Sequence, residues 1–194
     1  MNTNVREEKK MPELWDIYDE KRNKTGRFAQ RGPNALKEGE YHIIVVGIII
    51  NSKCELLISK RAPHKKHPLM WEFTAGSLLA GEESRQGVLR ELKEELGVKF
   101  ELEDAIYFKE IRRDEYPSDF KDMWLFKKDI DIKDLTFPDG EATEAKWVTI
   151  EEFMQMVQNK EIIPHIDFGL KEYQEILQIV NKSKQSILKS ASQE

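Results

Sequence analysis

The pattern of apolar and polar positions predicts a strand-rich middle, one central helix and further helices toward the C-terminus. Residues 42–50, with the sequence HIIVVGIII, form the most apolar run in the chain. Because β-branched residues dominate this run, it is typical of a strand that is buried on both faces of a sheet. Residues 51–53 then predict a short turn into a second strand at residues 55–60, the antiparallel neighbour of the first.

Other strands are predicted on both sides of this pair. Partial alternation at residues 14–18, followed by the turn-rich residues 20–26, predicts an N-terminal β-hairpin in which Gly26 closes the turn. Four further strands are expected, at residues 71–73, 105–112, 123–130 and 145–148. The charged residues 113–122 are expected to form a long loop that overhangs a site.

Three helices are predicted from apolar residues at helical spacing. The first begins after Ser84, the expected N-cap, and ends at Gly97, which tolerates a left-handed backbone. A capping box at residues 149–152 opens the second helix. From about Phe168, apolar residues at helical spacing predict an amphipathic C-terminal helix.

Together these elements predict one α/β domain in which helices sandwich a mixed sheet. The chain has 194 residues, enough for one domain with a full core. Residues 1–11 are polar and charged and are expected to be disordered, which leaves residues 12–194 as the single domain.

Composition narrows the classes of partner and compartment. A net charge of -5 argues against a nucleic-acid polymer as the main partner. The single cysteine, Cys54, excludes an intramolecular disulfide and fits the reducing cytoplasm; its place at a strand start favours a structural role. No segment approaches about 18 consecutive apolar residues, so no membrane span is expected. The N-terminus lacks the apolar core of a secretory signal.

The central helix carries an unusual density of acid. Glu91, Glu94 and Glu95 fall within an arc of roughly 100° on one face, beside an arc of apolar residues that is expected to be buried. Like charges four residues apart destabilise a helix, so a positive group should sit on this face. A divalent cation held by carboxylate oxygens is one candidate. The alternative is a solvated face with Arg90 and Lys93 as counter-charges.

The surrounding residues favour the cation. Gly76, five further residues, Glu82, seven further residues and then RELKEELGV ending at Val98 form a segment that resembles the Nudix box at every defining position. The resemblance implies a Nudix-type α/β/α sandwich with the box forming a loop, a helix and a loop. It also implies a hydrolase that cleaves a diphosphate linkage.

The resemblance implies roles for individual residues. Metal ions, Mg²⁺ or Mn²⁺, are expected on Glu91, Glu94, Glu95 and the backbone carbonyl of Gly76, where they would polarise phosphoryl oxygens and activate water. Arg90 is expected to orient a glutamate. Glu82 is ranked second, as a support for the loop or for an outer metal.

The general base is left open between a box glutamate and a glutamate from a later loop. The segment EATEAKWV offers Glu141 as the better late candidate and Glu144 as the weaker one. The catalytic set expected from the resemblance is therefore Glu94, Glu95, Arg90 and Glu141. The alternative reading of the two late glutamates is an ordinary charged lead-in to a strand.

A closer resemblance covers residues 13–27 and 40–77, which look like the branch of the family that includes isopentenyl-diphosphate isomerase. Arg61 and Lys65 match that enzyme's basic diphosphate-binding positions; the alternative is two solvated surface cations. His42 matches a histidine of the isomerase metal site, although at the head of an apolar strand a structural role is commoner.

Aromatic residues are candidates for stacking on a substrate. The candidates are Phe73, Tyr116, Phe120 and Trp124, and Phe73 is the one carried forward as substrate-binding.

The isomerase resemblance fails where its chemistry should lie. That enzyme needs a cysteine and a histidine between the tryptophan and the helix, and residues 71–78, WEFTAGSL, contain neither. The acid–base glutamate of the later strand is also missing from DFKDMWLF, whereas the box is complete. The scaffold therefore resembles the isomerase and the chemistry resembles the hydrolases.

Three hypotheses follow from these residues. The leading one is a metal-dependent hydrolase that cleaves a diphosphate linkage in a nucleoside diphosphate linked to another moiety, or in a related small molecule. The alternatives are isopentenyl-diphosphate isomerase and a non-catalytic nucleotide-binding regulator. A small molecule is the expected partner, and the hairpin or the C-terminal helix could pair subunits into a homodimer. The substrate and the number of metal ions are left open.

Overall fold

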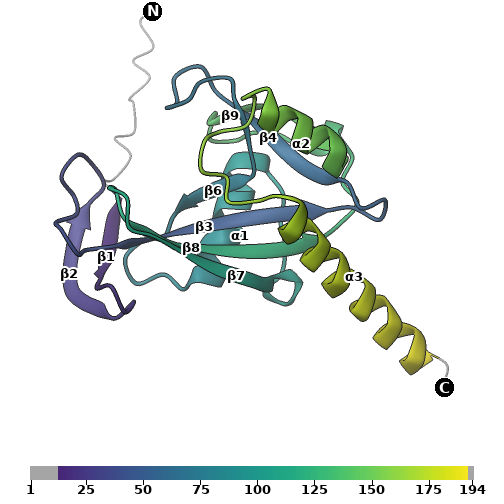
Figure 1. Cartoon of the computed structure of the whole chain (residues 1–194), viewed down its shortest axis with the longest axis horizontal. Coiled ribbons are helices and arrows are strands. Elements are labelled where there is room, and N and C mark those ends of the chain that lie inside the picture. The colour runs from purple at the N-terminus through teal and green to yellow at the C-terminus, as the bar shows by residue number, and fades with distance from the viewer. Residues whose placement is uncertain (1–12, 192–194) are drawn as a thin grey trace, which may run out of the picture.

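The computed structural model describes residues 13–191, and the side chains of residues 13–181. The disorder predicted for residues 1–11 lies outside the described residues. A seven-stranded sheet with helices on both faces forms the body, and a two-stranded hairpin lies beside it (Figure 1). The predicted α/β/α sandwich is confirmed; the single-domain organisation stays a prediction.

The chain forms nine strands, three helices and two short 3₁₀ turns over the described residues. The strands are β1 Leu14–Tyr18, β2 Lys24–Gln30, β3 His42–Ile50, β4 Leu56–Arg61, β5 Trp71–Glu72, β6 Thr74–Ser77, β7 Ile106–Arg113, β8 Asp119–Lys127 and β9 Ala142–Val148. The helices are α1 Ser84–Leu96, α2 Ile150–Gln158 and α3 Leu170–Ala191. Two short 3₁₀ turns, η1 Leu102–Asp104 and η2 Ile132–Asp134, complete the set.

The apolar run at the centre of the sequence is the central strand of the sheet. The order is β5-β4-β3-β8-β7, with β6 also paired to β3 and β9 to β4. The β3–β8 pair is parallel and the other pairs are antiparallel, so the sheet is mixed as predicted. Ile43, Val45 and Ile49 pack toward α1, while alternate residues such as Ile48 and Ile50 pack toward α2 and α3.

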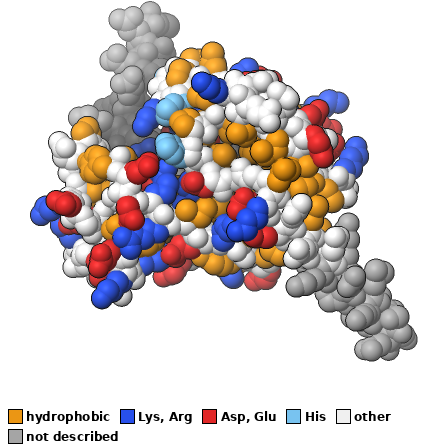
Figure 2. All heavy atoms as spheres, in the orientation of Figure 1, with side chains coloured by type: hydrophobic (Ala, Val, Ile, Leu, Met, Phe, Trp, Pro, Cys, Tyr) orange, Lys and Arg blue, Asp and Glu red, His pale blue; other side chains and the backbone are white. Residues whose placement is uncertain are grey.

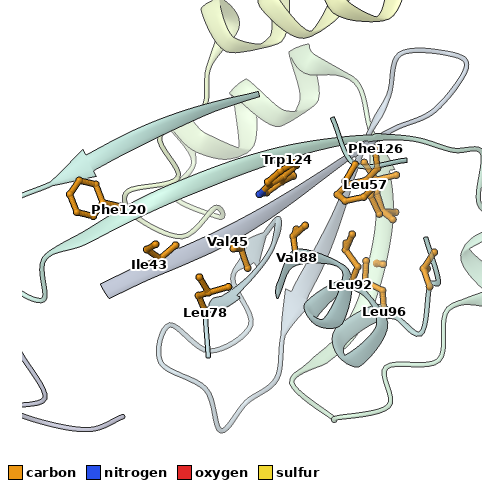
Figure 3. Packing of buried hydrophobic residues seen from close by; sticks show 14 of the residues in the cluster. Ile43, Val45, Leu57, Leu78, Val88, Leu92, Leu96, Phe120, Trp124 and Phe126 are labelled. Carbon is orange, nitrogen blue, oxygen red and sulfur yellow. The ribbon is translucent and has the colours of Figure 1, made fainter. Parts of the chain in front are cut away.

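Helix α1 covers one face of the sheet. Val88, Leu92 and Leu96 are buried and point toward the sheet, as Figure 3 shows. Gly47 allows this approach, because a Cβ there would lie 3.0 Å from the Leu92 Cδ2 atom. The helix ends at Gly97, whose φ of 73° confirms the predicted left-handed cap.

Two details of the predicted boundaries are wrong. Glu83, not Ser84, is the N-cap of α1, in a capping box with Gln86. The Ser84 hydroxyl instead accepts a hydrogen bond from the Trp124 indole N–H at 3.0 Å. Gly26 does not close the hairpin turn: it lies inside β2 with a φ of 78°, where the strand register shifts.

The turn of the hairpin is residues 19–23. There Asp19 Oδ1 accepts the backbone N–H of Asn23 at 2.8 Å.

The predicted loop at residues 113–122 is also wrong. Strand β8 begins at Asp119, four residues earlier than expected, so only residues 114–118 connect it to β7. The sequence pattern hides this strand because Asp119, Lys121 and Asp122 are buried charges. Their ion-pair partners are Arg113, Asp167 and Arg22, respectively. Buried charges of this kind are tolerated only when paired.

The C-terminal helix packs on the face of the sheet opposite α1. Ile176 and Val180 of α3 are buried there, and the helix then continues away from the body (Figure 1). Among the described residues, no helix combines the length and the apolar character that a membrane crossing requires. Figure 2 shows acidic and basic side chains interspersed over one face of the molecule.

Candidate active site

The site forms where one edge of the sheet runs alongside α1. Phe73 and Ala75 pack on the α2 side, so the alternating residues Glu72, Thr74 and Gly76 face α1. Two residues of strand advance about 6.7 Å and four residues of helix about 6 Å, so the two repeats nearly match. The strand residues can therefore lie opposite the glutamates that are four residues apart in α1.

Glu91 lies directly against Gly76. A Cβ at Gly76 would stand 1.9 Å from the Glu91 carboxyl carbon, so no side chain fits there. Burial raises the pKa of Glu91, and the neighbouring Arg90 guanidinium lowers it. The Glu91 carboxylate and the Gly76 backbone, both expected ligands from the resemblance, thus lie side by side.

Arg90 ties the acidic residues of the box together. Its Nε and Nη2 each donate to Glu82 at 2.9 Å. Its Nη1 donates to Glu91 at 2.7 Å and to Glu94 at 3.1 Å. Nη2 also donates to the Ser77 carbonyl at 3.1 Å, which fixes the loop before the helix. One arginine therefore bonds three carboxylates and offsets only part of their charge, and Glu82 holds that arginine in place.

Glu95 is the acidic residue without such a partner. Its side chain is only 2% exposed, and among the described residues its Oε2 has no hydrogen-bond partner. Burial raises the pKa of Glu95 well above its usual value, and the charges of Glu72 and Glu91 raise it further. A buried carboxylate with an unpaired oxygen is costly unless a cation compensates it.

Two cations face these acids, Arg61 from the end of β4 and Lys65 from the loop that follows it. The Arg61 Nη1 donates to Glu72 Oε1 at 2.5 Å, and Lys65 forms an ion pair with Glu141. The Arg61 and Lys65 side chains are 13% and 15% exposed, so neither is a solvated surface cation. Burial raises the pKa of both Glu72 and Glu95, and the positive charge of Lys65 offsets part of that rise.

The two late glutamates occupy different places. Glu141 precedes β9, and its carboxylate bonds Lys65 beside Glu72. Glu144 lies within β9 and pairs with Lys60 at 3.1 Å, with its side chain 54% exposed. The structure therefore brings Glu141 to the acidic cluster and leaves Glu144 at the surface.

Phe73 is not brought to the site. Its side chain is 1% exposed and packs against Phe153 at 5.3 Å and Phe168 at 5.1 Å between ring centroids. The expectation that Phe73 binds substrate is corrected accordingly, because its ring fills the core on the α2 side. Phe120 and Trp124 are also buried, which leaves Tyr116 as the exposed aromatic candidate.

His42 occupies a structural position. It is 4% exposed and stacks on Trp15 with ring centroids 4.1 Å apart. Burial lowers the pKa of His42 to about 4, so the imidazole is neutral near pH 7. These surroundings fit a structural role for His42 better than a metal-binding role.

Two residues that sequence reasoning passed over belong to the site. Glu72 lies between Arg61 and Glu95, and its place in the alternating run from Trp71 to Gly76 could have indicated it. Arg31 follows the hairpin and pairs with Glu13 at 2.7 Å. Burial lowers the pKa of Arg31, whereas the bonded Glu13 raises it and the negative charges of Glu141 and Glu91 raise it further, so Arg31 lies within electrostatic reach of these two acids. No local pattern in the sequence marks Arg31.

The donor set fits a hard divalent cation. Glu91 and Glu95 offer carboxylate oxygens, and the backbone of Gly76 lies against the Glu91 carboxylate, which makes its carbonyl a candidate ligand. In the described part of the chain, no three His, Cys, Asp or Glu side chains already converge as a metal-binding group. The Arg90 guanidinium instead stands among Glu82, Glu91 and Glu94.

Comparisons with known proteins agree with this geometry. A model of the NUDIX domain matches residues 40–166. An uncharacterized Nudix hydrolase of Listeria monocytogenes is 36% identical over 160 residues, which cover 79% of this chain and 89% of that protein.

Solved structures agree as well. A crystal structure from Deinococcus radiodurans aligns with a TM-score of 0.62 at 21% identity, over 77% of this chain and 91% of that one. The NUDIX domain of Shewanella oneidensis NrtR, solved with ADP ribose, aligns with a TM-score of 0.52 at 14% identity, over 81% of this chain and 94% of that one.

Proposed function

Because the chain belongs to the Nudix family and is a Nudix hydrolase, we propose that it uses Mg²⁺ or Mn²⁺ to cleave a diphosphate linkage in a small molecule. The substrate class is a nucleoside diphosphate linked to another moiety, or a related compound. The observation that carries this proposal is the pairing of Glu91 against Gly76 beside the buried, unpartnered oxygen of Glu95.

The α1 glutamates would hold the metal. Glu91, Glu94, Glu95 and the Gly76 carbonyl are the proposed ligands, and Glu94 and Glu95 are also catalytic candidates. When bound, the cation supplies the positive charge that polarises phosphoryl oxygens and activates water. Arg90 orients Glu91 and Glu94, with which it already forms hydrogen bonds. Glu141 is the late candidate for general base, held beside the cluster by Lys65.

The rest of the substrate would be held by cations and by a cavity. Arg61 and Lys65 offer charge-assisted hydrogen bonds to phosphate oxygens. A cavity of about 590 Å³ adjoins the outer side of α1, and Arg90 and Glu94 contribute to its wall. Its other walls are partly apolar and include Leu89 and Phe100. This volume is within the range of sites for small molecules.

Three further features belong to the same proposal. We infer a cytoplasmic location from the single cysteine, which fits a reducing compartment. We infer a single domain spanning residues 12–194 and an assembly that could be a homodimer. The resemblance to the isopentenyl-diphosphate isomerase branch stays a prediction. The residues at the reactive positions of that enzyme include neither cysteine nor histidine here, which argues against its chemistry.

A substrate panel tests the proposal. Nucleotide sugars, dinucleoside polyphosphates, ADP-ribose, NADH, nucleoside triphosphates and prenyl diphosphates are incubated with purified protein and Mg²⁺ or Mn²⁺. We expect at least one to be cleaved at its diphosphate, with activity lost in EDTA and restored by excess metal. Absence of cleavage across the panel would overturn the proposal. Isomerisation of isopentenyl diphosphate, or tight nucleotide binding without turnover, would favour one of the two alternatives.

A further inference from the structure

The Arg61 guanidinium is held from two sides. Its Nε donates to the Lys66 carbonyl at 2.7 Å, and its Nη1 donates to Glu72 Oε1 at 2.5 Å. Its Nη2 has no hydrogen-bond partner among the residues that the structure describes. One donor group of an otherwise fixed, largely buried arginine is therefore available to a ligand.

The backbone of Arg61 also closes the basic loop. Its N–H donates to the Met70 carbonyl at 2.9 Å, and its carbonyl accepts the N–H of Leu69 at 3.1 Å. These bonds fix where the side chain starts. The direction of the Arg61 side chain is then set by its ion pair with the Glu72 carboxylate.

The position of Glu72 is costly by itself. Its side chain is buried, and its negative charge repels that of Glu95. A buried ion pair alone gives little net stability, because desolvation offsets the attraction. An acid placed here, next to another acid, therefore suggests a role in the site beyond holding the fold together.

We propose that Glu72 is a positioning residue that holds the Arg61 guanidinium so that its Nη2 group binds a phosphate oxygen of the substrate. This inference rests on the proposed function, in which Arg61 is a phosphate-binding cation. An arginine that is already fixed loses less conformational entropy when a ligand binds. Glu72 thus acts through Arg61 and does not itself contact the substrate.

The test compares variants Glu72→Ala, Glu72→Gln, Arg61→Ala and the Glu72→Ala/Arg61→Ala double variant. The probe is methylenediphosphonate, a diphosphate analogue whose P–C–P linkage resists hydrolysis, titrated in the presence of Mg²⁺ by calorimetry. KM and kcat are measured on any substrate that the panel yields. Thermal unfolding shows which variants are folded. Glu172→Gln is the matched control, since Glu172 forms a comparable, partly buried ion pair with Lys109 at 3.0 Å.

We expect Glu72→Ala to weaken binding of the analogue about tenfold, the lower end of the range for a charged hydrogen bond. KM should rise by a similar factor, while kcat changes little. Glu72→Gln should recover part of the loss, because its amide oxygen still accepts a bond from Arg61. The double variant should bind no more weakly than Arg61→Ala alone, since Glu72 acts through that arginine.

Each contrary result has a distinct meaning. Unchanged binding by a folded Glu72→Gln and Glu72→Ala, or additive losses in the double variant, would overturn the positioning role. A wild-type protein that does not bind the analogue would overturn it as well. Normal binding with the expected pattern among variants, but no hydrolysis of any substrate, would uphold the positioning role and overturn the proposed function.

Discussion

At the residue scale, burial is the main cause of the raised pKa values of three carboxylates between α1 and the sheet. These are Glu72 of β5 and Glu91 and Glu95 of α1. Glu72 is bonded to Arg61 and Glu91 to Arg90. Glu95 has no corresponding arginine, and one of its oxygens is unpaired within the described structure. The Glu95 carboxylate is therefore the one of the three that is available to bind an added cation.

Replacing Glu95 with glutamine should separate activity from stability. We expect Glu95→Gln to lower kcat at least about a hundredfold, because a neutral amide is a poor ligand for a divalent cation. Its melting temperature should stay the same or rise, because a buried charge is removed. Glu103→Gln, at an exposed position, is the control for both measurements. A folded Glu95→Gln variant with full activity would contradict the assignment.

His42 should govern part of the acid stability. Burial lowers its folded-state pKa to about 4, below the ordinary value of 6.5. The unfolded chain therefore binds more protons between these values, so the stability is complete above pH 6.5 and is lost as the pH falls toward 4. We expect the wild type to lose about 3 kcal/mol more than His42→Gln across this range. Urea unfolding at several pH values measures the difference, and parallel curves would refute it.

At the element scale, an ion pair docks the hairpin turn on the sheet. Arg22 donates from Nη1 and Nη2 to the two oxygens of Asp122 in β8, at 2.7 and 2.6 Å, and also pairs with Glu110 in β7. The Asp122 side chain is 1% exposed, so it depends on this arginine for its charge balance. The hairpin, β7 and β8 are thus linked at one point.

Removing Arg22 should destabilise the whole fold. We expect Arg22→Ala to lower the unfolding free energy by about 3–5 kcal/mol, because it leaves a buried charge unpaired. Adding Asp122→Asn should recover part of the loss, since no charge then remains to be compensated. Urea unfolding measures both, with the exposed neighbour Lys21→Ala as control. A loss for Arg22→Ala no larger than for Lys21→Ala would show that the pair contributes little.

Elements were predictable where one local pattern decides them. The apolar run of β3 and the periodic stripe of α1 each specify their element without help from distant residues. The predicted start of strand β8 is four residues late, because Asp119, Lys121 and Asp122 look like loop residues until their partners are known. Those partners lie on other elements, so no local reading of charge could identify a buried strand there.

The same distinction applies to the site. Glu91, Gly76 and Arg90 lie within one continuous segment, and the resemblance of that segment to the Nudix box implies that they act together. Phe73 is a candidate only because it is aromatic, and aromatic character does not say whether a ring lies in the core or at the site. Arg31 was missed because it approaches α1 only through the docking of the hairpin.

At the scale of the whole molecule, the site is assembled from parts far apart in sequence. The box contributes Glu91 and Glu95, and the segment before β9 contributes Glu141. Arg61 comes from the end of β4, and Lys65 comes from the loop that follows it. The hairpin is joined to the box by hydrogen bonds, from the N–H of Ala80 to the Leu14 carbonyl and from the N–H of Gly81 to Asp16, both 2.8 Å. Arg31 therefore approaches the acids from the side of the hairpin.

A substrate with two phosphates would meet cations from both sides, so Arg31 should contribute to its binding. We expect Arg31→Ala to raise KM about three- to tenfold, since a partly exposed charge contributes less than a buried one. Arg31→Lys should retain part of the effect, and added salt should weaken it. Steady-state kinetics measure KM, with Arg27→Ala as the control because Arg27 pairs with Glu40 within the N-terminal region. If Arg31→Ala and Arg27→Ala gave the same KM as the wild type, the hairpin would support the fold alone.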